Sequence, residues 1–214
     1  MEKRLQMISM IGFFALCFST IFSFTLLIPV SIFKINIKYF ILIFRLSTFL
    51  VCISFISLIF AYVSSDFTNF NVFQNSHSDK PLIYKITGAW GNHEGSILLW
   101  ICMISLYGFF YSLISKSANE FKILVLKFQS ALFIIFALFI ILTSNPFLVN
   151  SVFVEEGLGL NPILQDPALA IHPPMLYLGY VGFSLVFSLA IASLFRNNLD
   201  QDWINEARTW SMIS

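Results

Sequence analysis

Five long apolar segments alternate with polar segments along the chain. A helix that crosses the hydrocarbon core of a bilayer needs about 20 apolar residues, and each of these segments is about that long. The first segment is too long for the apolar region of a signal peptide, and no A-x-A-like cleavage site follows it. We therefore expect an all-α fold, a polytopic integral membrane helix bundle that forms a single membrane domain over residues 1–214. The pattern predicts transmembrane helices at about residues 7–30, 41–63, 97–115, 128–148 and 175–195.

Two of the polar segments are long, at about residues 64–96 and 149–174. The orientation of a membrane protein can be predicted from its lysines and arginines, because these residues accumulate in loops on the inner side of the membrane. With the N-terminus and both long loops on one side, that side has four of the 12 basic residues and the other side has eight. The distribution predicts that the N-terminus and the long loops face outward. All three histidines, His77, His93 and His172, would then lie on the outer side.

Composition narrows the classes of function. Hydrophobic residues make up 58% of the chain and charged residues 11%, which is less than half of the charged share of soluble domains. The net charge of +1, without a basic cluster, argues against a nucleic-acid partner. The predicted spans are almost free of ionisable residues, which argues against a subunit that translocates ions. The cysteines Cys17, Cys52 and Cys102 lie in apolar segments without a CxxC motif, so we interpret them as buried small side chains.

The first segment with candidate chemistry is GAWGNHEGS, residues 88–96, directly before the third predicted span. Its glycines favour a tight backbone with close approaches. Trp90 is an amphipathic ring suited to the headgroup level, and the imidazole of His93 can bind a metal or accept a proton. A turn that only anchors the helix at the interface explains the same residues.

The second such segment is NPILQDPALAIHPP, residues 161–174. Pro173 and Pro174 suit the first turn of the fifth helix, where missing N–H groups cost little. They would fix the direction of His172, and an imidazole held at the membrane surface among apolar and aromatic groups is suited to be an axial ligand of haem. An ordinary interfacial histidine is the alternative. The acidic pair Glu155 and Glu156 is interpreted as a solvated face of the same loop.

Two of these stretches carry a resemblance to a known family. The sequences TGAWGNHEGSILLW and LNPILQDPALAIHPPMLYLGYVGFS resemble the N-terminal part of the CcmF/NrfE family of cytochrome c haem lyases. The polar stretch SDFTNFNVFQNSHSDKPLIYKITG is similar to the alphaproteobacterial and mitochondrial branch of that family. The resemblance covers most of the chain from about Asp66 to Ser193.

The resemblance implies a role in cytochrome c maturation. Members of the family receive b-type haem, their substrate, from a haem chaperone at the outer membrane face. They help to form thioether bonds between the haem vinyl groups and the two thiols of the CxxCH motif in apocytochrome c, which a thiol-reducing partner keeps reduced. The resemblance implies that His172 serves as an axial ligand of the haem iron. His93 and Trp90 are weaker candidates for contact with the same haem.

Full members of the family continue into a tryptophan-rich WWD segment, and this sequence does not reach one. We therefore expect a split or truncated lyase whose partner is the remaining part of the enzyme with the WWD segment, and we expect no activity from this chain alone. The alternative is a structural membrane subunit with no direct contact to haem. In both cases we expect a multi-pass protein of a bacterial plasma membrane or a mitochondrial inner membrane, in contact with membrane lipid.

Overall fold

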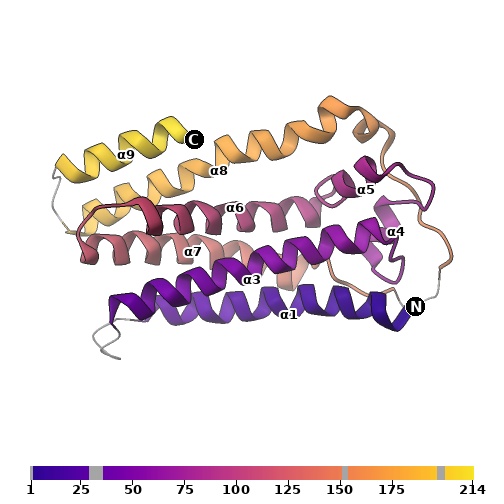
Figure 1. The fold of residues 1–214 in the computed structure, drawn as a ribbon, viewed down its shortest axis with the longest axis horizontal. Helices are drawn as coiled ribbons and strands as arrows, with labels where there is room; N and C mark the ends of the chain where they lie inside the picture. The colour runs from indigo at the N-terminus through magenta and orange to yellow at the C-terminus, as the bar shows by residue number, and fades with distance from the viewer. Residues whose placement is uncertain (1, 29–35, 151–153, 197–200) are drawn as a thin grey trace.

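Consecutive long helices of the chain run antiparallel and form an elongated bundle (Figure 1). The computed structural model describes residues 2–28, 36–150, 154–196 and 201–214, and no strand occurs within these ranges. The elements in order are α1 (Glu2–Leu27), α3 (Ile37–Val63), α4 (Phe70–Asn75), α5 (Leu82–Gly88), α6 (His93–Ile114), α7 (Asn119–Thr143), the 3₁₀ helix η1 (Pro162–Gln165), α8 (Pro167–Arg196) and α9 (Gln201–Ile213).

Five of these helices are long and apolar enough to cross a membrane, which confirms the expected all-α bundle with five spans. The apolar stretches are Gln6–Leu27, Ile37–Val63, His93–Ile114, Asn119–Thr143 and Ala170–Arg196. All five helices begin earlier than the apolar pattern suggested, and in every one except α8 the first turn contains polar residues. Residues 29–30 of the first predicted span lie outside the described part of the chain.

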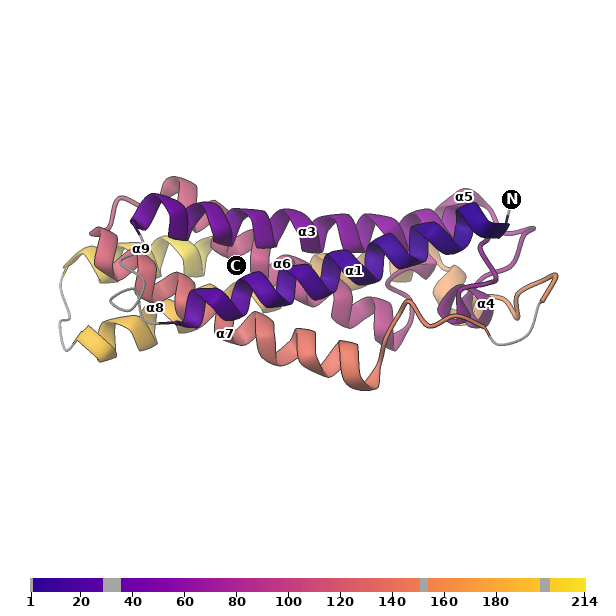
Figure 2. The same cartoon turned by 90° about the horizontal axis from the view of Figure 1, so that it is seen from below.

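Small and hydroxylated residues allow the helices to pack closely, as is usual where lipid offers no hydrophobic driving force between them. α1 and α3 lie side by side along the bundle (Figure 2). The Ser19 hydroxyl donates to the carbonyl oxygen of Ser47 at 2.8 Å, and the Ser23 and Ser47 hydroxyls are 2.8 Å apart. α6 contacts α3, α7 and α8 and is the most buried of the five spanning helices.

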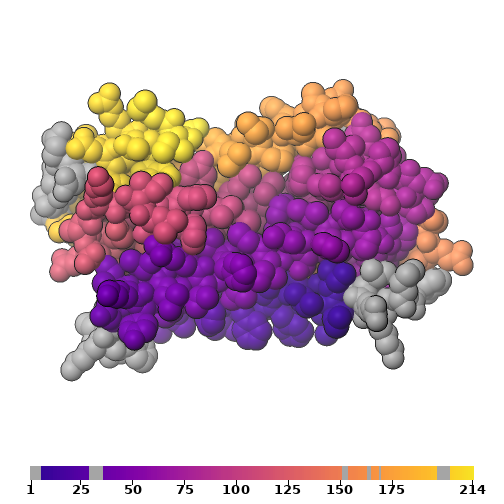
Figure 3. Space-filling view, viewed as in Figure 1, coloured from indigo at the N-terminus to yellow at the C-terminus, as the bar shows by residue number. Residues whose placement is uncertain are grey.

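Different segments of the chain lie over the two ends of the bundle. α4, α5 and the described residues of 144–166 cover one end, which we call the loop end, and the N-terminus lies there too (Figure 1). At the other end, which we call the opposite end, α6 joins α7 and α9 begins. α9 lies along only part of α8, so the first half of α8 stands clear of it in the space-filling view (Figure 3).

The start of α8 corrects one prediction. Pro173 and Pro174 are not in its first turn but inside the helix, which begins at Pro167. The first turn instead follows Asp166, whose carboxylate accepts a hydrogen bond from the backbone N–H of Ala168 at 2.7 Å. An aspartate before the first turn and a proline at its first position are strong signals for the start of a helix, and here they precede the proline pair.

Candidate functional site

A largely apolar cavity of about 720 Å³ lies at the loop end, between α6, α7 and α8. Cavities that bind small molecules usually have a volume of about 300–1,000 Å³ and a few polar groups. The lining residues are Trp90, Gly91, Asn92, His93, Ser96, Ile97, Trp100, Ile135, Phe136, Phe139, Pro173 and Tyr177. The structure thus brings both segments with candidate chemistry to one cavity.

The turn before α6 forms one wall of the cavity, and its own side chains fix its shape. Asn92 is the N-cap of α6, and its side-chain oxygen accepts from the backbone N–H of Gly95 at 2.8 Å. The Ser96 hydroxyl donates to the carbonyl oxygen of Trp90 at 2.7 Å. A Cβ at Gly95 would overlap the carbonyl oxygen of Ala89, so this position accepts no side chain without a backbone shift.

The two segments are joined by a hydrogen bond that the prolines of α8 make possible. Trp90 donates from Nε1 to the carbonyl oxygen of Ala170 at 2.9 Å, across 80 positions of the sequence. In a regular helix that carbonyl accepts from the N–H four residues later, which is the position of Pro174 and has no N–H. The Trp90 indole therefore supplies the donor that the helix lacks.

Aromatic rings make up much of the remaining wall. The ring centroid of Trp100 lies 5.4 Å from that of Tyr177 and 6.1 Å from that of Phe136. These distances and the edge-on geometry are typical of favourable aromatic pairs. The cavity thus offers flat, polarisable surfaces to an occupant, with polar groups concentrated where the turn 90–96 meets it.

The three candidate residues occupy different places. Trp90 and His93 line the cavity, and the exposed His93 ring lies edge-on to Phe139 with centroids 6.2 Å apart. His172 is exposed on α8, one position before the lining residue Pro173. One position turns a helix by about 100°, so His172 lies on the neighbouring face of α8.

Among the described residues, no group of three or more His, Cys, Asp or Glu side chains could hold a metal ion. Porphyrin itself supplies four of the iron ligands of haem, so a haem site needs only single imidazoles.

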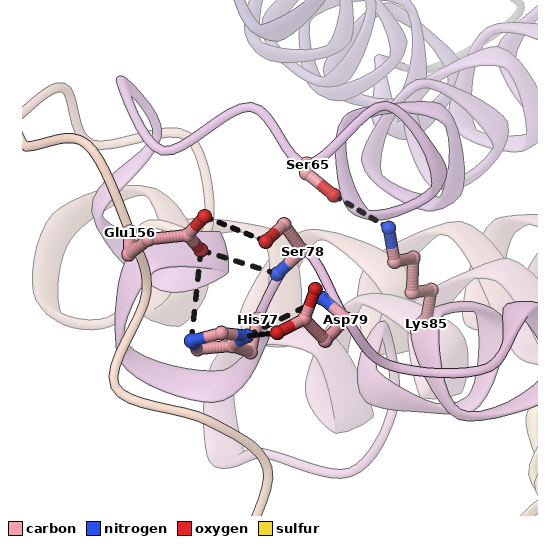
Figure 4. A network of polar contacts seen from close by, with 6 residues as sticks. All are labelled: Ser65, His77, Ser78, Asp79, Lys85 and Glu156. Carbon is pink, nitrogen blue, oxygen red and sulfur yellow. Dashed lines mark hydrogen bonds and ion pairs between the residues drawn. The ribbon is translucent and has the colours of Figure 1, made fainter.

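The third histidine belongs to a separate polar network that links the two long loops (Figure 4). His77 Nε2 lies 3.7 Å from Glu156 Oε2, and the Ser78 hydroxyl donates to Glu156 Oε1 at 2.6 Å. The hydrogen bond from Ser78 lowers the pKa of the exposed Glu156 carboxyl. Beside it, Lys85 Nζ donates to the Ser65 hydroxyl at 2.8 Å. The contacts of Glu156 join segment 154–160 to segment 76–80. None of the residues in this network lines the cavity.

Several buried polar residues at the loop end were not predicted from the sequence. Asp66 is fully buried, and burial raises the pKa of its carboxyl. Tyr62 and Asn71 are buried beneath the turn that precedes α6. The only signal for them was the recurrence of aspartate and asparagine between apolar residues in 66–75, which is also typical of a solvated loop. The sequence analysis also gave no sign that Cys52 and Cys102 are close, yet their sulfur atoms lie 3.7 Å apart.

Comparisons with known proteins agree with the resemblance. Residues 90–213, more than half of the chain, match the family described as Cytochrome C assembly protein. The chain is 51% identical over 166 residues to the cytochrome c-type biogenesis protein CycK of Rhizobium meliloti, an alignment that covers 77% of this chain and 25% of the relative. It is 42% identical over 165 residues to the cytochrome c-type biogenesis protein CcmF of Escherichia coli, with 75% and 25% covered.

The fold is also that of a solved structure. Cytochrome c Heme Lyase CcmF superposes with a TM-score of 0.81 and 22% sequence identity, over 96% of this chain and 33% of that one. The chain spans about a quarter of the length of the curated relatives it matches.

Proposed function

The chain belongs to the cytochrome c assembly protein family, and from this membership we propose that it helps to hold haem at the outer membrane face for covalent attachment to apocytochrome c. Its five apolar helices and its relatives make it a multi-pass inner membrane protein. In the proposed orientation the loop end faces outward, because that side has fewer lysines and arginines.

The observation that carries the proposal is the cavity at the loop end, where both family-like segments meet beside His172. We propose His172 as an axial ligand of the haem iron. Its imidazole is exposed, so it is accessible to haem that another protein presents. Trp90 and His93 belong to the cavity wall next to it and would contact the ring or its substituents. The chain would hold the haem while the thiols of apocytochrome c add to the vinyl groups.

Other proteins are required by this proposal. They are a haem chaperone that delivers the substrate, the remaining part of the lyase with its WWD segment, and apocytochrome c with its thiol-reducing partner. The chain spans about a quarter of its relatives, so we assign it haem holding rather than the complete ligation reaction.

The test compares His172→Ala with His77→Ala in the tagged chain, expressed in a host that matures c-type cytochromes. Both histidines belong to the loop-end segments, but His77 lies in the Glu156 network and not beside the cavity. We expect His172→Ala to abolish the Soret absorbance that co-purifies with the chain and to lower the yield of c-type cytochrome. His77→Ala should leave both unchanged, and His172→Met should retain haem with a shifted spectrum.

Identifying the co-purifying polypeptides tests the partners in the same preparation. A second chain with the WWD segment supports the proposal. An unchanged haem spectrum in His172→Ala would contradict the assignment of His172 and favour a structural subunit without haem contact.

A further inference from the structure

Two buried side chains and a partly buried one, from three different elements, form a closed ring of hydrogen bonds beneath the cavity wall. Tyr62, in the last turn of α3, donates from its hydroxyl to Asn71 Oδ1 at 2.6 Å. Asn71, on α4, donates from Nδ2 to Asn92 Oδ1 at 2.9 Å. Asn92, the N-cap of α6, donates from Nδ2 back to the Tyr62 hydroxyl at 3.0 Å. The ring therefore joins α3, α4 and the start of α6 at one point.

Every N–H of the two side-chain amides has a partner. The second N–H of Asn71 Nδ2 donates to Glu94 Oε2 at 3.2 Å, and the second N–H of Asn92 Nδ2 donates to the carbonyl oxygen of Gly88 at 2.7 Å. Asn92 Oδ1 also accepts from the backbone N–H of Gly95. A buried network in which every donor has a partner fixes a single arrangement, whereas loss of one member leaves the others unsatisfied.

The ring is also tightly packed against the turn. Tyr62 is fully buried and Asn71 is 4% exposed. A Cβ at Gly88 would lie 2.7 Å from Cε1 of Tyr62, so the backbone of the turn rests directly on the tyrosine ring. Asn92 is at the same time a lining residue of the cavity, between Trp90 and His93 in sequence.

We propose that Tyr62 and Asn71 are positioning residues for the cavity. Neither lines the cavity, but together they fix the Asn92 side chain and thereby the turn 88–96, which presents Trp90 and His93. This inference concerns the shape of the cavity wall, and only its consequence for haem rests on the proposed function.

The experiment measures amide hydrogen exchange in the purified full chain for Tyr62→Phe and for Tyr111→Phe as its matched control. Both tyrosines are fully buried in spanning helices and both variants lose one hydroxyl, but Tyr111 packs against Trp210 away from the cavity. Tyr62→Phe removes two bonds of the ring. We expect exchange in peptides covering residues 88–96 to become about tenfold faster, with the Gly95 amide as the most direct reporter, and the rest of α6 to remain unchanged.

Tyr111→Phe should not change exchange in 88–96. Equal rates in wild type and Tyr62→Phe, or the same increase in both variants, would overturn the proposal. Asn71→Asp is the second variant, in case Tyr62→Phe does not fold. It keeps the acceptor for Tyr62 but loses the donors to Asn92 and Glu94, so the same local increase is expected.

Titration with hemin, followed by its Soret band, then separates this inference from the proposed function. If wild type binds hemin, Tyr62→Phe should weaken binding about tenfold and Tyr111→Phe should not, because a merely stabilising tyrosine would not act on the cavity alone. Faster exchange with unchanged hemin affinity would refute a positioning role for the ligand. If the wild-type chain purified together with its partners fails to bind hemin, the proposed function is contradicted, while the exchange rates still decide whether the ring positions the turn.

Discussion

The two ends of the bundle handle their polar groups in different ways. At the opposite end, charged side chains make local tethers: Arg45 donates to the side chain and backbone of Ser112 at 3.0 Å. Glu206 of α9 accepts from Ser115 and Ser117 at 2.6 and 2.9 Å. The loop end has such tethers too, from Lys85 to Ser65 and from Ser78 to Glu156. In addition, neutral amides and one phenol form the closed ring of Tyr62, Asn71 and Asn92 there. A tether holds two elements together, whereas a closed ring fixes the angles of a backbone turn. The difference indicates that the chain needs geometric accuracy where its cavity lies.

Gly95→Ala is the substitution that we expect to destabilise the loop end most. The new Cβ would overlap the backbone carbonyl of Ala89, which cannot rotate away, so we expect a loss of about 3 kcal/mol or more in the free energy of unfolding. Gly179→Ala is the control, because its Cβ would lie 3.4 Å from the Ser214 carbonyl oxygen and the change should stay within about 1 kcal/mol. Thermal unfolding in detergent measures both, and equal midpoints would refute the required close approach.

Trp90→Phe is expected to have the next largest effect. It leaves the Ala170 carbonyl without the donor that replaces the missing N–H of Pro174, at a cost of about 1–3 kcal/mol. Pro174→Ala restores a backbone N–H at that position. The penalty of Trp90→Phe should therefore be smaller in the Pro174→Ala background, as a double-mutant cycle of unfolding free energies would measure. Additive penalties would show that the indole and the proline act independently.

At the opposite end, Glu206→Gln should cost about 1 kcal/mol, because the amide oxygen can still accept from Ser115 and Ser117 but the new NH₂ group cannot accept from Trp210 Nε1, and the site is partly exposed. The change should loosen α9 and make it more sensitive to limited proteolysis. Hemin affinity should not change, since α9 does not line the loop-end cavity. A loss of hemin affinity as large as that of Tyr62→Phe would remove the functional distinction between the two ends.

The smallest expected effect is the pH dependence of two carboxyl groups at the loop end. The Ser78 hydrogen bond lowers the pKa of Glu156, so the link between the two loops is fully present above pH 4.5 and is lost as the pH falls through the lowered value. Burial raises the pKa of Asp66, so the folded chain takes up this proton above pH 3.8 and the group favours folding as the pH falls. The Ser78 amide donates to Glu156 Oε2, so its protection factor, the intrinsic exchange rate at each pH divided by the observed rate, should fall between pH 7 and pH values below 4 and report only the first effect. Glu156→Gln should remove this change in protection.

Much of the fold could be predicted because lipid imposes a simple requirement on composition. Five nearly charge-free apolar segments predicted five helices that are long and apolar enough to span a membrane. The starts were less predictable, since a helix can continue past the lipid with charged residues in its first turns. α7 begins at Asn119 and includes Glu120, Lys122 and Lys127, although the apolar pattern began only at 128.

The site could be predicted only in part. The segments around Trp90, His93 and His172 stood out because their residue types were unusual for the surroundings. The ring could not be found in the same way, because Tyr62, Asn71 and Asn92 are ordinary residues separated by nine and 21 positions. The pair Pro173 and Pro174 was misplaced for a similar reason: a proline inside a helix is tolerated when a distant side chain satisfies the freed carbonyl, and here that side chain is 80 positions away.

The proline pair gives α8 uneven stiffness. Two successive positions contribute no N–H to the backbone ladder, so residues 167–172 are joined to the rest of the helix by fewer backbone bonds than any ordinary turn. This first part of α8 ends at His172, next to the proline pair. The hydrogen bond from the Trp90 indole to the Ala170 carbonyl oxygen holds it against the turn before α6. We therefore expect α8 to bend most easily at the proline pair, directly beside the proposed haem ligand His172, while residues 175–196 keep their place in the bundle.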